Sequence, residues 1–133
     1  MRLISETALA AITIWQEARG EAYEGKLAVA EVIRNRMKER YASDGTVAGT
    51  VLRARQFSGW NTEDVNRIPS LKIDDADKAV HECVRAWKEA TSYGTRTAKG
   101  ALLYYAPALA LPGWAKGCRE VARVGGHVFL VPR

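Results

Sequence analysis

The sequence predicts an α+β domain in which helices come first and a small antiparallel sheet follows. Two observations carry this prediction. Up to about residue 91, apolar residues recur at helical spacing, whereas from residue 100 onward short runs rich in Val, Leu, Tyr and Phe are separated by glycines. Helices followed by strands are typical of α+β domains. With 133 residues and no linker or repeat, residues 1–133 are expected to form one domain.

A first helix is predicted over residues 6–18. Ser5 is a suitable N-cap, and Ile4 and Leu9 are placed to form a hydrophobic staple. Residues 8–15 are apolar on every face except at Thr13, which is typical of a helix buried in the core. Gly20 then marks the end of this helix.

Further helices are predicted over residues 24–40, 46–53 and 74–91. The apolar face of the second helix is formed by Leu27, Ala30, Ile33 and Met37. Its charged residues Glu31, Arg34 and Arg36 are expected on the remaining surface. The helix at 74–91 begins near Asp74 or Asp75, and its apolar stripe consists of Ala76, Ala79, Val80, Cys83, Val84 and Trp87. Residues 55–64, RQFSGWNTED, are predicted to form a loop or tight turn.

The last third is predicted to contain strands within residues 100–107 and 120–132. The second of these segments reads as a hairpin whose turn is Gly125–Gly126. These strands complete the α+β pattern.

The net charge of +5 and the pI near 9.4 are compatible with a polyanionic partner. Nucleic acid, an anionic membrane and an anionic cell wall all remain open on this ground, as does a role in solubility alone. No apolar run approaches the roughly 18 residues of a membrane span, so stable membrane insertion is not expected. The first twenty residues do not resemble a signal peptide, and synthesis in the cytoplasm is expected.

Cys83 and Cys118 are the only cysteines, and they lack metal-ligand spacing. We expect both to be free thiols, with one disulfide as the alternative. His81 and His127 are the only histidines, so neither a metal site nor a cofactor is expected.

Glu17 is the strongest candidate for chemistry. It follows an apolar helix and should emerge where that helix ends. Partial burial beside Ile14 and the electronegative C-terminus of the helix both favour a protonated carboxyl group. A general acid requires such a group near neutral pH. Glu24, at the start of the next helix, should remain ionised. A solvated glutamate at a helix end is the alternative for Glu17.

Four segments in order carry a resemblance to a known family: WQEARGEAYEGKLAVAEVIRNR, QFSGW, LLYYAP and VGGHVFL. Together they resemble the catalytic domain of the spore-cortex-lytic, SleB-type cell wall hydrolases. The resemblance extends from about Ile12 to Phe129. It implies a mainly helical fold similar to lytic transglycosylases and goose-type lysozymes. It also implies cleavage of peptidoglycan glycan strands between N-acetylmuramic acid and N-acetylglucosamine. The protein is expected to be a monomer.

The catalytic glutamate of that family falls on Glu17, the first glutamate of EARGE. The resemblance implies that Glu17 protonates the glycosidic oxygen and then serves as base for the C6 hydroxyl of muramic acid, which leaves a 1,6-anhydro end. Hydrolysis is the alternative outcome, with Glu21, Glu24 or Asp64 positioning a water molecule.

Several residues are candidates for a sugar-binding groove. In QFSGW, Gln56 and Ser58 offer hydrogen bonds and Trp60 offers a flat face, whereas Phe57 is expected in the core. Strand alternation sends Tyr104 and Tyr105 to opposite faces, and Tyr104 is favoured for the cleft. The remaining candidates are Asn61, Trp114 and His127. Each could also serve only in packing.

Three polar residues near the EARGE segment are expected to act around the site. Arg19 and Arg36 could contact acidic peptide stems or the anionic wall, or could pair with nearby glutamates. Asn35 is expected to be a buried anchor for the EARGE turn.

Two other classes of function remain alternatives. The basic helix GKLAVAEVIRNRMKER could be a nucleic-acid recognition helix, although four neighbouring glutamates would repel phosphate. A wall-binding protein without activity would keep the same groove. The sequence lacks the wall-binding repeat and the secretion signal that are usual in the spore enzymes. We therefore expect an endolysin that reaches the wall at host lysis.

Overall fold

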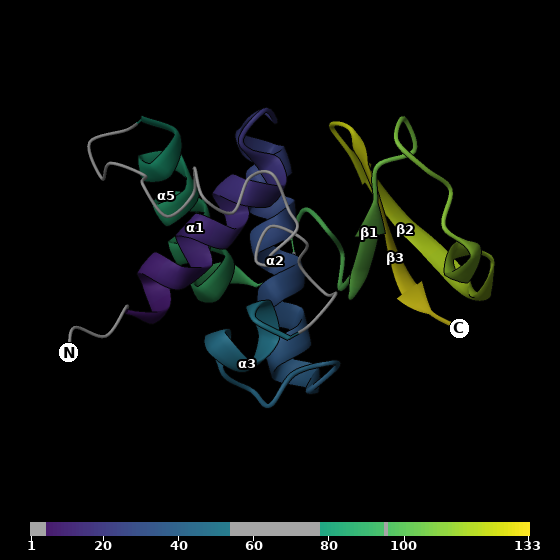
Figure 1. Ribbon diagram of the computed structural model, residues 1–133, viewed down its shortest axis with the longest axis horizontal. Coiled ribbons are helices and arrows are strands. Elements are labelled where there is room, and N and C mark those ends of the chain that lie inside the picture. Colours follow the sequence, from purple (N-terminus) through teal and green to yellow (C-terminus); the bar gives the residue numbers. More distant parts are fainter. Residues whose placement is uncertain (1–4, 54–77, 95) are drawn as a thin grey trace.

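A computed structural model describes residues 5–53, 78–94 and 96–133 of the chain. Within these residues, four helices lie together, and a three-stranded sheet stands beside them (Figure 1). The helices are α1 (Glu6–Ala18), α2 (Tyr23–Glu39), α3 (Val47–Val51) and α5 (Lys78–Tyr93). The strands are β1 (Leu103–Tyr105), β2 (Cys118–Val124) and β3 (His127–Pro132). The predicted α+β class is confirmed.

Helix α1 follows its sequence signals closely. The Ser5 side chain accepts a hydrogen bond from the Ala8 amide at 3.1 Å and so caps the helix. Thr13, the polar exception in the apolar run, donates its hydroxyl to the Leu9 carbonyl at 2.8 Å, which allows it to be fully buried. Leu9 is buried as expected, but its staple partner Ile4 lies outside the described residues.

Helix α2 is buried over most of its length, and the expected charged surface is partly wrong. Every residue from Gly25 to Ile33 is buried. Glu31 and Arg36 were expected to be solvated, but they are only 1% and 4% exposed. Both find hydrogen-bond partners on distant segments, which makes their burial tolerable. This stretch of α2 therefore has no free face that could enter a DNA groove.

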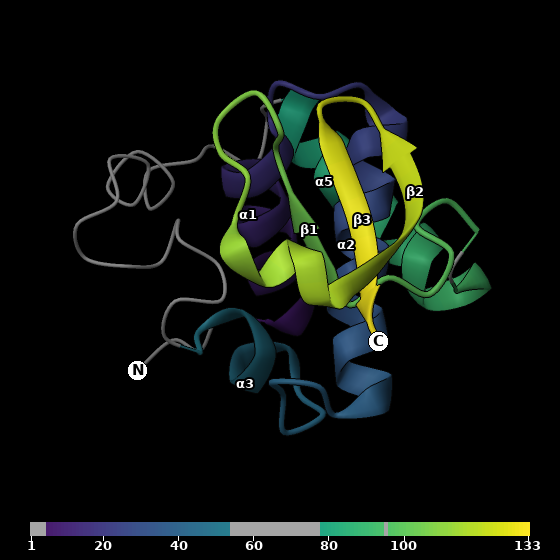
Figure 2. The ribbon, with the colours of Figure 1, turned by 90° about the vertical axis from the view of Figure 1, so that its right-hand side faces the viewer.

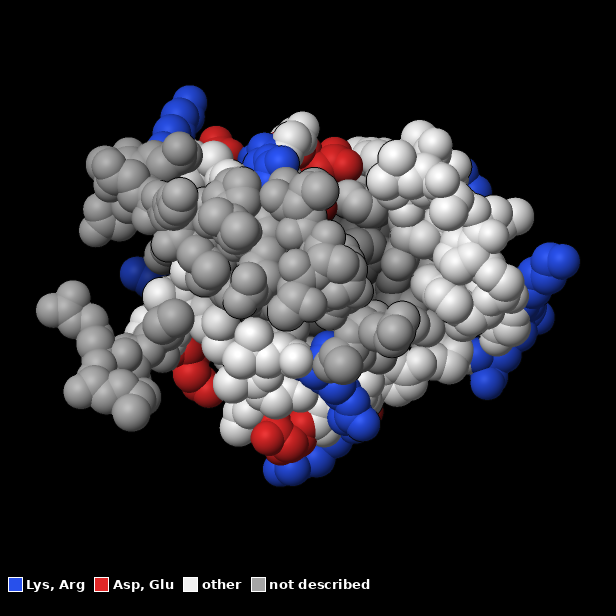
Figure 3. Space-filling model, in the orientation of Figure 1, with Lys and Arg blue, Asp and Glu red and all other residues white. Residues whose placement is uncertain are grey.

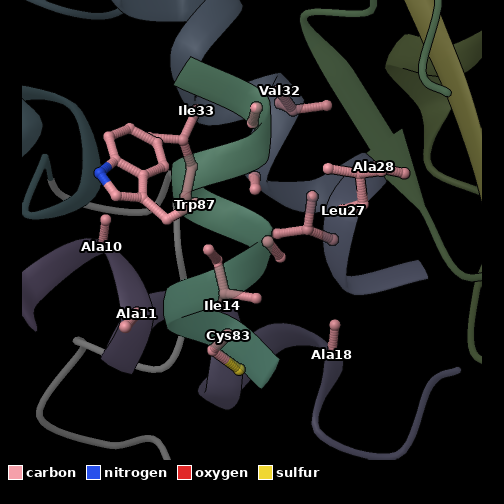
Figure 4. Close-up of a cluster of buried hydrophobic side chains, with 14 of the residues drawn as sticks. Ala10, Ala11, Ile14, Ala18, Leu27, Ala28, Val32, Ile33, Cys83 and Trp87 are labelled. Carbon is pink, nitrogen blue, oxygen red and sulfur yellow. The ribbon is translucent and has the colours of Figure 1, made fainter. Parts of the chain in front are cut away.

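The hydrophobic core joins all four described helices. In Figure 4, Ile14 of α1, Leu27 of α2 and Cys83 of α5 belong to one cluster of buried side chains. Trp87 extends the cluster along α5 and is 6% exposed. α5 ends two residues later than expected, and the expected start near Asp74 or Asp75 lies outside the described residues. The core thereby fixes α1, which carries Glu17, against α2, α3 and α5.

The sheet has the order β1-β3-β2, and both strand pairs are antiparallel (Figure 2). The β2–β3 hairpin turns at Gly125–Gly126, as predicted, and Gly125 has a φ of +56°. β1 pairs Tyr104 with Phe129, but it is only three residues long and is therefore shorter than the segment expected to form it. A short 3-10 helix, η2 (Gly113–Gly117), lies between β1 and β2 and was not predicted.

Candidate active site

Glu17 lies in the last turn of α1, where it is half-buried. Its flanking residues Gln16 and Ala18 are buried, so the helix carries the carboxyl group to the edge of the core. The Tyr104 hydroxyl donates a short hydrogen bond to Glu17 Oε1, across 87 residues of sequence. Tyr104 was the tyrosine favoured for the cleft, and it is the one that contacts Glu17.

The sheet holds the Tyr104 ring in place. The ring packs against Phe129 at a centroid distance of 5.6 Å and meets the His127 ring edge-on at 5.2 Å. Burial raises the pKa of the Tyr104 phenol well above its usual value, the charge of Glu17 and the hydrogen bond to it add to this effect, and Arg36 opposes it. The phenol therefore keeps its proton and acts as a hydrogen-bond donor to Glu17.

Arg36 places a buried positive charge near this pair. Its Nε donates to the Leu102 carbonyl at 2.6 Å, two residues before Tyr104. Burial lowers the pKa of Arg36, and the acidic groups of Tyr104, Tyr41 and Glu17 oppose this effect. The expected contact of Arg36 with the wall is therefore wrong, because the side chain is turned inward. The alternative expectation, that Arg36 pairs with a nearby glutamate, agrees better with the structure, because Arg36 interacts electrostatically with Glu17.

Three features surround the Glu17 carboxyl group. It is half-buried at the C-terminal end of α1, as expected from the sequence. The Tyr104 hydroxyl donates a hydrogen bond to it, and the buried charge of Arg36 interacts with it electrostatically. The carboxyl group is therefore held by a donor from the sheet and lies near a cation from α2.

Glu21 belongs to the turn between α1 and α2, and its side chain contacts the tip of the β2–β3 hairpin. The Gly126 amide donates to its Oε1 and Oε2 at 3.0 and 3.3 Å, and His127 Nδ1 lies 3.3 Å from Oε1. Burial lowers the pKa of His127 below its usual value, and Glu21 opposes this effect. His127 is the first residue of β3, and its ring contacts the Tyr104 ring. Glu24 is exposed in the first turn of α2.

Tyr105, Trp114 and Arg19, the other described candidates, make their contacts away from the Glu17 carboxyl group. Tyr105 points to the opposite face of β1 from Tyr104, as predicted, and meets Trp114 edge-on at a centroid distance of 6.2 Å. Trp114 belongs to η2 and is 46% exposed. The Arg19 guanidinium stacks over Trp15 at 4.5 Å. Gln56, Phe57, Ser58, Trp60, Asn61 and Asp64 lie outside the described residues.

Asn35 and Glu31 are structural anchors of the segment that leads to β1. Asn35 is buried and donates to the Ala101 carbonyl at 3.0 Å, so its anchoring role is confirmed but its target is not the EARGE turn. The Glu31 carboxylate accepts from the amides of Thr97 and Ala98 at 2.8–3.1 Å. The burial of Glu31 and Arg36 was not predicted from the sequence, although both lie three or four residues from apolar positions on the buried face of α2.

Other features of the described residues lie apart from Glu17. Cys83 and Cys118 are free thiols, as expected. No three potential metal ligands gather among these residues, and no helix in this part of the chain is long and apolar enough to cross a membrane. A hollow of about 540 Å³ on α5 is lined by Val80, His81, Val84, Arg85 and Lys88. Lysine and arginine side chains lie at several separate places around the face in Figure 3.

Comparisons with known proteins agree with this architecture. The catalytic domain of the germination-specific lytic transglycosylase SleB from Bacillus anthracis superposes with a TM-score of 0.76 at 24% identity, covering 95% of this chain and 93% of that one. The catalytic domain of the Bacillus cereus SleB protein gives 0.76 at 25% identity, with 95% and 89% covered. The mainly helical fold with a small C-terminal sheet is therefore that of the SleB catalytic domain.

Curated relatives place the chain within a family. The spore cortex-lytic enzyme of Oceanobacillus iheyensis is 32% identical over 121 residues, which cover 91% of this chain and 40% of that protein. The Bacillus subtilis enzyme of the same name is 30% identical, with 91% and 36% covered. The chain thus spans about two fifths of the length of these relatives. The family model described as Cell Wall Hydrolase matches residues 20–130, and the chain therefore belongs to the Cell Wall Hydrolase family.

Proposed function

We propose that this domain cleaves peptidoglycan glycan strands between N-acetylmuramic acid and N-acetylglucosamine, as a lytic transglycosylase with Glu17 as its acid and base. The observation that carries this proposal is the hydrogen bond from Tyr104 to a half-buried glutamate at the end of a core helix. The match to the family model begins at residue 20, three residues after Glu17. The role of Glu17 therefore rests on its geometry and on the EARGE motif.

The proposed reaction uses one carboxyl group twice. Glu17 first donates its proton to the glycosidic oxygen, and the bond between C1 of muramic acid and that oxygen breaks with its electron pair moving to the oxygen. The C6 hydroxyl of the same muramic acid then bonds to C1, and its proton passes to Glu17. The products are a 1,6-anhydro end and a new sugar hydroxyl, and Glu17 regains its acid form. No water is consumed.

The surroundings of the other carboxylates favour this route over hydrolysis. A hydrolase normally uses a second carboxylate opposite the first to activate water or to form a covalent intermediate. Glu21 is already engaged by the Gly126 amide and lies beside His127, and Glu24 is exposed. Asp64 lies outside the described residues. Hydrolysis, the alternative outcome, would be recognised by reducing-end products.

The test compares wild type with Glu17→Gln on purified peptidoglycan, followed by mass spectrometry of the released muropeptides. The proposal expects anhydro-muropeptides, one water lighter than reducing-end products, from wild type and none from the folded variant. Glu39→Gln, an exposed glutamate at the end of α2, is the matched control and should remain active. Full activity of Glu17→Gln would contradict the assignment. Reducing-end products would support hydrolysis, and binding without cleavage would support a non-catalytic wall protein.

The biological setting is a separate proposal. We propose that the domain acts as an endolysin, which reaches the wall when the host membrane is breached. Expressed in the cytoplasm of a bacterium, it should leave cells intact until the membrane is permeabilised and should then lyse them, whereas Glu17→Gln should not. Lysis without permeabilisation would contradict this setting without affecting the proposed reaction.

A further inference from the structure

Glu21 is held in a cradle built by residues from the other end of the chain. The hairpin turn that surrounds its carboxylate consists of Gly125 and Gly126, and Glu21 accepts from the Gly126 amide across 105 residues of sequence. A Cβ on Gly125 would come within 2.4 Å of Oε2, and one on Gly126 within 2.9 Å of Oε1. The absence of side chains at both positions allows the carboxylate to reach the turn.

The main chain of Glu21 is fixed as firmly as its carboxylate. Lys26 is 3% exposed, and its Nζ donates to the Glu21 carbonyl at 2.6 Å while pairing with Glu82 at 3.1 Å. On the other side, Gly25 leaves so little space that a Cβ there would lie 2.7 Å from the Cβ of Glu21. The main chain and the Cβ of Glu21 are therefore fixed in the turn between α1 and α2.

The hairpin that Glu21 contacts is linked to Glu17 through the side chains of His127 and Tyr104. His127 follows the cradle, with Nδ1 3.3 Å from Glu21 Oε1, and its ring meets the edge of the Tyr104 ring at 5.2 Å. Tyr104 in turn donates its hydroxyl to Glu17. A continuous series of contacts thus runs from Glu21 through the hairpin to the proposed acid.

We propose that Glu21 is a positioning residue: it anchors the β2–β3 hairpin to the turn between α1 and α2 and so holds Tyr104 against Glu17. This inference rests on the proposed function, because it assigns Glu21 a part in orienting the proposed acid. It excludes Glu21 as the carboxylate that activates water. A displacement of about 1 Å in a catalytic group can lower a rate by about 100-fold, so such an anchor has consequences for turnover.

The first test separates the hydrogen-bonding role of Glu21 from a role of its charge. Glu21→Gln keeps an oxygen that can accept from Gly126, whereas Glu21→Ala removes it. We expect Glu21→Ala to lower kcat by about 10- to 100-fold with unchanged binding in a peptidoglycan pelleting assay, and Glu21→Gln to restore most of the loss. Glu39→Ala is the exposed control. If Glu21→Gln is as inactive as Glu21→Ala, or if Glu21→Ala equals wild type, the proposal is overturned.

The second test disturbs the cradle without changing Glu21. Gly125→Ala inserts a methyl group where the carboxylate lies, and it should reproduce the loss of kcat in Glu21→Ala. Gly94→Ala is the matched control, because Gly94 also has a positive φ, +74°, and its Cβ would meet Arg34 only at an ordinary contact of 3.5 Å. This control carries the backbone strain alone. Equal activities of Gly125→Ala and Gly94→Ala would overturn the proposal. This comparison holds even if Glu21→Ala fails to fold.

A third measurement does not depend on activity. The chain has five tyrosines, and ¹³Cζ labelling gives each a resonance that responds to hydrogen bonding of its hydroxyl. Glu17→Gln should shift the Tyr104 resonance, and Glu21→Ala and Gly125→Ala should shift it as well, whereas Gly94→Ala should not. If wild type did not cleave peptidoglycan, the proposed function would be contradicted. The same shifts would still show that Glu21 positions Tyr104. An unmoved Tyr104 resonance in Glu21→Ala and Gly125→Ala would overturn the role itself.

Discussion

Tyr104→Phe is the most direct probe of how Glu17 is controlled. The substitution removes one hydroxyl group and leaves the ring between His127 and Phe129, where its centroid contacts of 5.2 and 5.6 Å do not need the oxygen. The change therefore isolates the hydrogen bond to Glu17.

The expected size follows from the change of charge on Glu17 during the proposed reaction. As Glu17 gives its proton to the glycosidic oxygen, its carboxylate becomes negative, and the hydrogen bond from Tyr104 strengthens. A hydrogen bond to a charged group exceeds one between neutral groups by about 1 to 2 kcal/mol, so this stabilisation is gained mainly at the transition state. Its loss corresponds to a kcat about 5- to 30-fold lower.

The assay is the initial rate of muropeptide release from purified peptidoglycan, measured well below the melting temperature of each variant. Tyr105→Phe is the matched control, because it makes the same change one residue along on the opposite face of β1, and it should remain within about two-fold of wild type. A Tyr104→Phe rate equal to that of Tyr105→Phe would refute the reasoning. A loss as complete as that of Glu17→Gln would also refute it, since Tyr104 would then take part in proton transfer itself.

Three further predictions concern stability and accessibility. Glu31→Ala should lower the free energy of unfolding in urea by on the order of 3 kcal/mol, because the buried amides of Thr97 and its neighbour lose their acceptor; Glu31→Gln, which keeps a carbonyl oxygen, should lose less. The pKa of His127 is lowered by burial from 6.5, so as the pH falls through about 6.5 the unfolded chain binds a proton before the folded chain does. Urea stability should therefore fall from about pH 7 down to that lowered pKa, and less steeply in His127→Gln. A thiol reagent under native conditions should modify half-buried Cys118 and leave fully buried Cys83 unreacted until the protein unfolds.

Elements with local signals were predicted well from the sequence. The Ser5 cap and the apolar run of α1 act within one helix, and the Gly-Gly turn of the hairpin is a property of adjacent residues. Strand alternation also separated Tyr104 from Tyr105 correctly. These signals depend on neighbours a few residues away, and they hold whatever the rest of the chain does.

The polar interior of α2 could not be predicted in the same way. Glu31 and Asn35 each bond to a residue 66 or 67 positions later, and the partner of Glu21 lies 105 positions away. Periodicity assigns a charged residue to the surface by default, because burial is favourable only when a partner is present. Asn35 was expected to be a buried anchor, but no local pattern reveals the partner of any of these residues, so the partners appear only in three dimensions.

These buried polar residues explain how a proposed site with one carboxyl group can span two separate elements. Glu17 belongs to α1 and Tyr104 to β1, and the hydrogen bond between them requires the short sheet to be held in register with the helices. Asn35 and Arg36 of α2 bind the carbonyls of Ala101 and Leu102, just before Tyr104. β1 has only three residues and would be a poor support alone. Apolar packing is non-directional and tolerates small sliding, whereas a hydrogen bond with a fixed partner sets one position. The polar anchors therefore supply the precision that the proposed chemistry at Glu17 requires, and the apolar core supplies the stability.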